Sequence, residues 1–107
     1  MKKSELSKLN FKSFLRVCYP EIEPHLLREL ERLRDEIITL PESSSENTLL
    51  TIFEKSVNNL NRIDEDNSID ARIDTEEREG LCSVLYTMGE TVGLDVNTEF
   101  IDNWRDW

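Results

Sequence analysis

The sequence predicts an all-α fold, a compact single-domain bundle of about five helices that spans residues 1–107. Leucines and other apolar residues recur at helical spacing along most of the chain, and no stretch keeps the alternation of a half-buried strand. Glycine and proline each occur only three times, so few positions interrupt a helix. A chain of this length can bury about two thirds of its unfolded surface, which is enough for one core.

Two helices are predicted in the first forty residues. The first runs from Ser4 to Cys18 and stops before Pro20, because the residue before a proline is pushed out of helical geometry. Its apolar face comprises Leu6, Leu9, Phe14 and Val17, widened by Phe11, Leu15 and Cys18. The second begins near Pro24 and ends at Pro41, and its apolar stripe comprises Leu26, Leu30, Leu33 and Ile37. On its charged face, Arg32 and Glu36 are close enough to pair.

Three further helices are predicted in the rest of the chain. The third runs from Thr48 to Ile63, with Asn47 or Thr48 as its cap and an apolar stripe of Leu49, Phe53, Val57 and Leu60. The fourth starts near Asp74 or Thr75, where Asp74 and Glu77 have the spacing of a capping box. Its stripe is Leu81, Leu85, Met88 and Val92, its glycines 80 and 89 would admit a close neighbour, and Gly93 suits the position after its end. The last helix starts at Asn97 and directs Phe100, Ile101 and Trp104 toward the core.

Charge is distributed unevenly along the chain, whose net charge is −10. Residues 1–40 contain eight Lys/Arg and seven Asp/Glu, whereas residues 41–107 contain five and sixteen. An acidic surface repels phosphates and anionic lipids, so we expect neither direct nucleic-acid binding nor membrane attachment, and we expect a basic protein as partner. The N-terminal segment has no apolar run of the kind found in a secretory signal, so a cytoplasmic location is expected.

Residues 64–79, DEDNSIDARIDTEERE, form the most acidic segment, with eight carboxylates and two arginines. Repulsion among these carboxylates raises the free energy of the compact state, so solvation, a metal or a cationic partner should compensate. We expect an exposed, mobile hinge that Ile69 and Ile73 pin to the core. The candidate partner-binding residues come from this segment and from the last residue of the sequence: Asp64, Glu65, Asp66, Asp70, Asp74, Glu76, Glu77 and Trp107.

No residue pattern in the sequence indicates an enzyme. The one histidine, His25, lies in the first turn of a predicted helix, where a solvated or capping role is expected. Cys18 and Cys82 lack the spacing of a metal site and are expected to be buried, reduced thiols, with a single disulfide as the alternative. An EF-hand loop starting at Asp64 would have Ile69 in place of its glycine and Thr75 in place of its glutamate. We therefore expect no catalysis, no cofactor and no metal.

A small, acidic, all-helical domain of this kind resembles the bacterial immunity proteins that neutralise colicin nucleases or the toxins of contact-dependent growth inhibition. The resemblance rests on the acidic segment, on the helix start TEERE at residues 75–79, and on WRDW at residues 104–107. The tyrosine pair of the colicin-nuclease inhibitors is absent, so the candidate residues follow from charge and position alone. The resemblance implies a monomer that binds a basic toxin, expected to be a nuclease domain, in a 1:1 complex and blocks its cleft as a phosphate mimic.

Two other classes of protein would also have an acidic surface. A regulatory adaptor would bind a basic host or phage protein without blocking a nuclease, and a neighbouring gene for a large secreted toxin would distinguish the two. A small calcium-binding helical protein would show a calcium-dependent shift in melting temperature instead.

Overall fold

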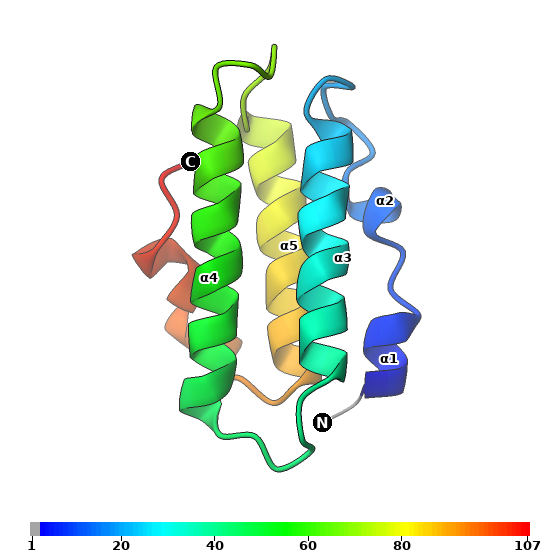
Figure 1. Cartoon of the computed structure of the whole chain (residues 1–107), viewed down its shortest axis with the longest axis vertical. Coiled ribbons are helices and arrows are strands. Elements are labelled where there is room, and N and C mark those ends of the chain that lie inside the picture. Colours follow the sequence, from blue (N-terminus) through cyan, green and yellow to red (C-terminus); the bar gives the residue numbers. More distant parts are fainter. Residues whose placement is uncertain (1–2) are drawn as a thin grey trace.

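Three long helices run side by side in the computed structural model of the chain, which describes residues 3–107 (Figure 1). They are α3 (Glu23–Ile38), α4 (Glu46–Glu65) and α5 (Thr75–Thr91). Two short helices, α1 (Lys3–Ser7) and α2 (Phe11–Phe14), contact both α3 and α5, and two 3₁₀ helices, η1 (Val96–Thr98) and η2 (Phe100–Asn103), follow α5. The described residues contain no strand, which confirms the predicted all-α fold. Within the same range, no helix is both long enough and apolar enough to cross a membrane.

The predicted apolar stripes of the three long helices form the core. All four stripe residues predicted on α3 are buried, and so are the four predicted on α4 and the four predicted on α5. Helices α3 and α4 pack against each other, while η2 contacts both α4 and α5. Because burying one large aliphatic side chain contributes about 1.5–3 kcal/mol, these stripes, which hold half of the buried hydrophobic residues of the described chain, are a major source of stability.

The predicted N-terminal helix from Ser4 to Cys18 is wrong, since this segment forms α1 and α2 with non-helical residues between and after them. Asn10 has extended backbone angles, with φ of −97° and ψ of 94°. In a continuous helix of about 100° per residue, Leu6 and Leu15 would point in opposite directions. The interruption lets both leucines enter the core, while Val17, expected on the apolar face, is exposed.

Helix ends follow local capping rules, with one correction. Ser45 caps α4 by accepting from the Thr48 N–H at 3.2 Å, so the predicted cap at Asn47 or Thr48 is wrong. Asp74 and Glu77 form the predicted capping box of α5. At the other end, Gly93 has a φ of 93° and the Leu94 N–H reaches back to the Gly89 carbonyl at 2.9 Å, which confirms the predicted glycine stop.

The close approaches expected at the two α5 glycines are present. A Cβ on Gly80 would lie 2.1 Å from the backbone oxygen of Phe14 in α2, and a Cβ on Gly89 would lie 2.9 Å from the ring of Phe100. The helix expected to start at Asn97 is replaced by η1 and η2, because Glu99 between them has a φ of 51°. Phe100 and Ile101 are nevertheless buried as expected, and the Phe100 ring packs edge-on to Phe53 and Tyr86.

Candidate protein-binding surface

The acidic segment is a hydrogen-bonded connection between α4 and α5 rather than an open hinge. Asp64 lies in the last turn of α4, and its carboxylate accepts from the Ile73 N–H at 2.7 Å. The Asp66 carboxylate accepts from the backbone N–H and the hydroxyl of Ser68, at 2.9 and 2.7 Å. The guanidinium of Arg72 donates to the backbone oxygens of Asp66 and Ala71, both at 2.9 Å. Ile69 and Ile73 are buried, which confirms that they pin the segment to the core.

Backbone amides thus stabilise half of the carboxylates in this segment. Asp64, Asp66, Asp74 and Glu77 each accept at least one backbone N–H. The hydrogen bonds from Ser68 also hold the pKa of Asp66 below its usual range. Solvation, a metal or a cationic partner was expected to offset the repulsion among these carboxylates. Hydrogen bonds from backbone N–H groups provide part of that compensation, which the sequence pattern did not predict. Among residues 3–107, no three His, Cys, Asp or Glu side chains converge in a way that could hold a metal ion.

Glu77 cannot be a surface contact, which corrects its assignment to the partner-binding set. Its side chain is only 2% exposed. One carboxylate oxygen accepts from the Asp74 N–H at 3.0 Å, and the other accepts from the Tyr19 N–H at 2.9 Å. Glu77 therefore closes the capping box and also joins the α2–α3 connection to the start of α5. The Glu77 side chain points toward this junction, so its negative charge stabilises the fold and does not face a partner.

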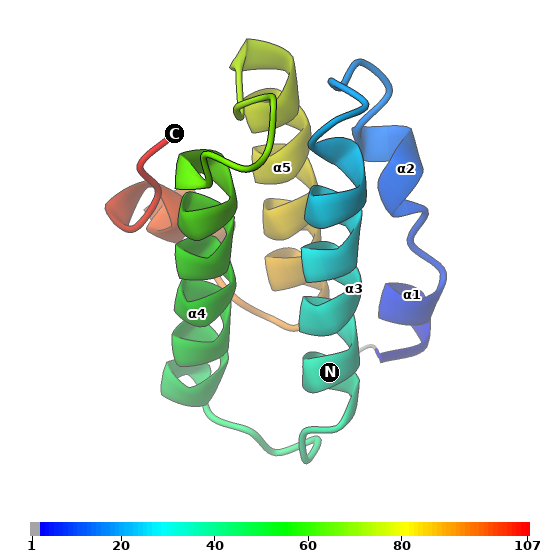
Figure 2. The same cartoon turned by 45° about the horizontal axis from the view of Figure 1, so that its top comes forward.

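Trp107 is also buried, at 9% exposure, which corrects its assignment to the partner-binding set. The guanidinium of Arg105 lies 5.6 Å from the centre of its ring. Asn61 of α4 holds the preceding residues, because its side chain donates to the Trp104 carbonyl and accepts from the Asp106 N–H, both at 3.0 Å. This end of the chain lies on the opposite side of the bundle from the α2–α3 connection (Figure 2).

Val17 and Tyr19, which the sequence reasoning did not single out as site residues, are the exposed large hydrophobic residues of the described chain. Val17 is 64% exposed and Tyr19 is 49% exposed. Both lie in the α2–α3 connection, after the buried Leu15 and before Pro20. For Tyr19 a signal was available in the sequence: the residue directly before a proline is disfavoured in a helix, so it need not belong to a buried stripe.

The α2–α3 and α4–α5 connections lie at the same end of the bundle (Figure 1), and residues of both line common hollows. A pocket of about 310 Å³ lies between residues 17–20 and residues 74–77. Two further hollows of about 280 and 330 Å³ are lined respectively by Tyr19 with Asp70 and Asp74, and by Val17 with Glu76 and Glu79. Six exposed residues that each line at least one of these hollows are called here the acidic–aromatic surface: Val17, Tyr19, Asp70, Asp74, Glu76 and Glu79.

This surface brings together three of the predicted partner-binding residues, namely Asp70, Asp74 and Glu76. Asp64, Glu65 and Asp66 lie at the end of α4 and line none of these three hollows. The surface is negative overall, because its four carboxylates face only two cations, Arg16 and Arg72, in the same hollows. Arg72 donates to the backbone carbonyls of Asp66 and Ala71 and forms no ion pair with these four carboxylates within residues 3–107.

Both cysteines are free and half-buried, so the expected thiols are present without a disulfide. Cys18 lines the pocket between residues 17–20 and 74–77. Burial, followed by the nearby charge of Glu77, raises the pKa of the Cys18 thiol to about 12. Burial also raises the pKa of Cys82. Since the thiolate is the reactive form, neither cysteine has the character of a nucleophile.

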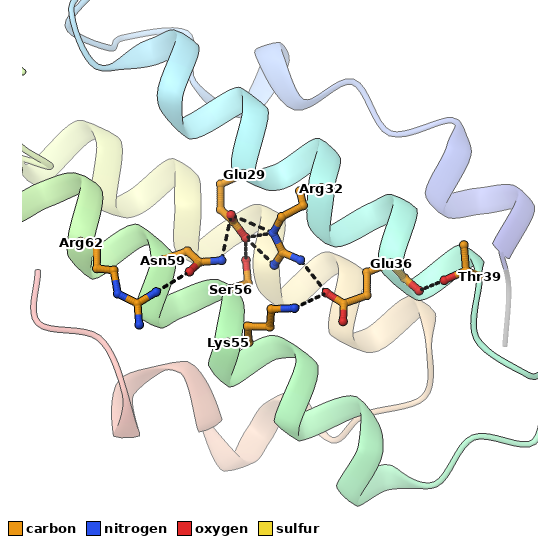
Figure 3. A network of polar contacts seen from close by, with 8 residues as sticks. All are labelled: Glu29, Arg32, Glu36, Thr39, Lys55, Ser56, Asn59 and Arg62. Atoms are coloured by element: carbon orange, nitrogen blue, oxygen red, sulfur yellow. Dashed lines mark hydrogen bonds and ion pairs between the residues drawn. The ribbon is translucent and has the colours of Figure 1, made fainter.

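A buried polar network joins α3 to α4, and the sequence pattern did not predict it, because it places the charged residues of α3 on a face away from the core. Glu29 is 7% exposed and accepts from Arg32, Ser56 and Asn59, at 2.7, 2.8 and 3.1 Å. Figure 3 shows these side chains converging on the Glu29 carboxylate from both helices. The predicted Arg32–Glu36 pair is present at 2.5 Å. Because both Glu29 oxygens are occupied, this cluster fixes the helix pair and leaves no free acceptor for chemistry.

Comparisons with protein-family models, with curated proteins and with solved structures find no match to this chain.

Proposed function

We propose that this protein binds a basic protein through its acidic–aromatic surface and thereby neutralises that partner as a toxin inhibitor. The observation that carries the proposal is the position of Tyr19 and Val17, which are exposed and line hollows together with the carboxylates of residues 70, 74, 76 and 79. Exposed aromatic residues are common anchors of protein interfaces, and charge around them guides the approach of an oppositely charged partner. The proposed partner is a basic toxin that forms a 1:1 complex with this chain. The negative charge of the chain favours a nuclease domain as that toxin.

Occlusion of a nuclease cleft is the mechanism that this surface supports best. A cleft that holds nucleic-acid phosphates is positively charged, so it attracts a cluster of carboxylates. Asp70, Glu76 and Glu79 are exposed, and within residues 3–107 no hydrogen bond or ion pair engages their side chains. Such groups keep their charge available for a partner. Opposite charges would accelerate association, and the burial of Tyr19 and Val17 would then slow dissociation.

The test is co-expression with the product of the adjacent gene in the native genome. The proposal expects that product to be basic, to arrest growth when expressed alone, and to form a stoichiometric complex in which its activity is lost. The double substitution Tyr19→Ala/Asp70→Lys should abolish protection. The control Glu54→Lys/Glu90→Lys, which changes two exposed carboxylates elsewhere on the chain, should not. Protection that survives the first pair of substitutions would contradict the proposed surface.

A regulatory adaptor remains the second candidate, because a basic host or phage protein would meet the same exposed Tyr19 and carboxylates. It differs in outcome: the complex would form with the same dependence on charge, yet no toxicity would be relieved. A calcium-binding function receives no support from the arrangement of carboxylates in the described residues.

A further inference from the structure

We infer that the pocket between residues 17–20 and residues 74–77 receives an arginine side chain of the partner. This inference rests on the proposed function and adds the residue type that the surface recognises. The pocket has a volume of about 310 Å³ and opens between the α2–α3 connection and the first turn of α5. Its two sides differ in chemistry, and each side matches a different part of one long cationic side chain.

The first side is apolar. Val17, Tyr19 and Pro20 line it, and Val17 and Tyr19 are both well exposed. The methylene stem of an arginine or lysine can cover such a surface while its charged head stays at the pocket mouth. The exposed part of the Tyr19 ring also offers a face on which a planar guanidinium can stack.

The second side is acidic. Asp74 and Glu76 line it with exposed carboxylates, and the Glu77 carboxylate lies beneath them with both oxygens already accepting backbone N–H groups. The start of α5 contributes a positive end of about half an elementary charge, which opposes a cation. Three carboxylates outweigh that half charge, so the pocket remains favourable for a cation.

Arginine fits this pair of sides better than lysine does. A guanidinium is planar, is less strongly hydrated than an ammonium, and presents several donors that can reach two carboxylates at once. The neighbouring cations do not occupy the site: Arg72 donates to the backbone carbonyls of Asp66 and Ala71, and Arg16 lines the adjoining hollow with Glu76 and Glu79. An arginine of the partner would therefore neutralise carboxylates of the pocket that no cation of this chain pairs with in the described residues.

The experiment uses the isolated full chain and a defined probe, Nα-acetyl-arginine amide, in a nitrogen–proton correlation NMR titration. We expect saturable shifts confined to the amides of Cys18, Tyr19, Thr75 and Glu76, with a dissociation constant of about 1–10 mM, as for a small ligand at an open site. The citrulline analogue, which is nearly isosteric and uncharged, should produce no saturable shifts. The lysine analogue should bind about threefold more weakly.

Substitutions separate the two sides of the pocket. Tyr19→Ala and Glu76→Gln should each weaken arginine binding by about threefold, the effect of one partly exposed contact. Tyr19→Phe keeps the ring and should bind as the native chain does, and Glu90→Gln, on an exposed residue near the other end of α5, should also leave binding unchanged. The remaining amide positions report whether each variant is folded.

Two outcomes would overturn the inference. Shifts that never saturate and that spread over exposed carboxylates such as Asp35 and Glu90 would show charge screening without a site. Equal shifts with the citrulline analogue would show an apolar contact with no preference for a cation. Either result would overturn the arginine pocket only, and the proposed function would stand if the native chain still neutralises the co-expressed toxin. If the native chain binds the arginine probe but does not neutralise the toxin, the proposed function alone would be contradicted.

Discussion

Replacing Glu77 with Ala should destabilise the protein and release the α2–α3 connection from α5. The Glu77 carboxylate is 2% exposed and accepts from the Tyr19 N–H at 2.9 Å and from the Asp74 N–H at 3.0 Å. Glu77 thereby links the α2–α3 connection, which carries Tyr19, to the start of α5. Truncation removes both acceptors at once and leaves two backbone donors to find other partners.

The size of the effect follows from these two hydrogen bonds. A hydrogen bond to a charged acceptor contributes about 1.5–3 kcal/mol, and the bond from the partly buried Tyr19 N–H should lie in that range. The Asp74 N–H is at a helix start that water can reach, so its loss should cost about 0.5–1 kcal/mol. Together they give a loss of about 2–4 kcal/mol, a large part of the roughly 5–15 kcal/mol typical of a domain. Glu77→Gln keeps one acceptor and should cost about half as much.

Urea unfolding followed by circular dichroism measures this loss as a midpoint lowered by about 1–2 M, if the slope is about 2 kcal/mol per M. Glu76→Ala is the matched control, because Glu76 occupies the same helical turn but is exposed, and it should cost less than about 1 kcal/mol. Hydrogen exchange at the Tyr19 amide should accelerate in Glu77→Ala. Equal stabilities of the Glu77 and Glu76 variants, with unchanged exchange at Tyr19, would refute the reasoning.

Three other features give independent predictions. Glu29→Ala should lower the free energy of unfolding, measured in urea, by about 2–4 kcal/mol, because the buried Ser56 hydroxyl and the Arg32 guanidinium lose their acceptor. A loss under about 1 kcal/mol would show that the network is dispensable. Gly80→Ala should cost more than about 3 kcal/mol or displace α2, since its Cβ would lie 2.1 Å from a backbone oxygen of that helix; a silent substitution there would contradict the packing. Because the pKa of Cys18 is raised to about 12, alkylation of the native protein should be slow at pH 8 and accelerate as the pH rises toward that value. Labelling at pH 8 as fast as in urea would be the contrary result.

The three long helices could be predicted because each has a stripe of buried apolar residues at helical spacing. The stripe on α3 and the capping box at Asp74 are examples in which pattern and local chemistry agree. The first and last segments could not be predicted in the same way. Their apolar residues also fit a helical pattern, but Leu6 and Leu15 reach the core only after the chain bends at Asn10, and tertiary packing decides that bend.

Charge alone could not identify which carboxylates are available to a partner. Asp70 and Glu77 look equivalent in the sequence, yet one is exposed and the other is buried under the Tyr19 amide. Tyr19 was overlooked because it lies 58 residues from Glu77 along the chain, and only the fold brings the two segments together. The prediction for Trp107 was wrong for the converse reason: the residue is buried, Arg105 lies over its ring, and Asn61 holds the backbone of the residues before it.

The association rate constant with the co-expressed toxin tests the proposed surface most directly. Asp70→Lys/Glu76→Lys and Glu54→Lys/Glu90→Lys change the net charge of −10 by equal amounts, and residues 76 and 90 are about 21 Å apart along α5. Asp74 is left intact because it caps α5. At low salt the first pair should slow association at least about tenfold and the second pair much less, with the difference shrinking at high salt. Equal slowing by both pairs would show that only total charge matters, and would contradict a binding surface centred on Tyr19.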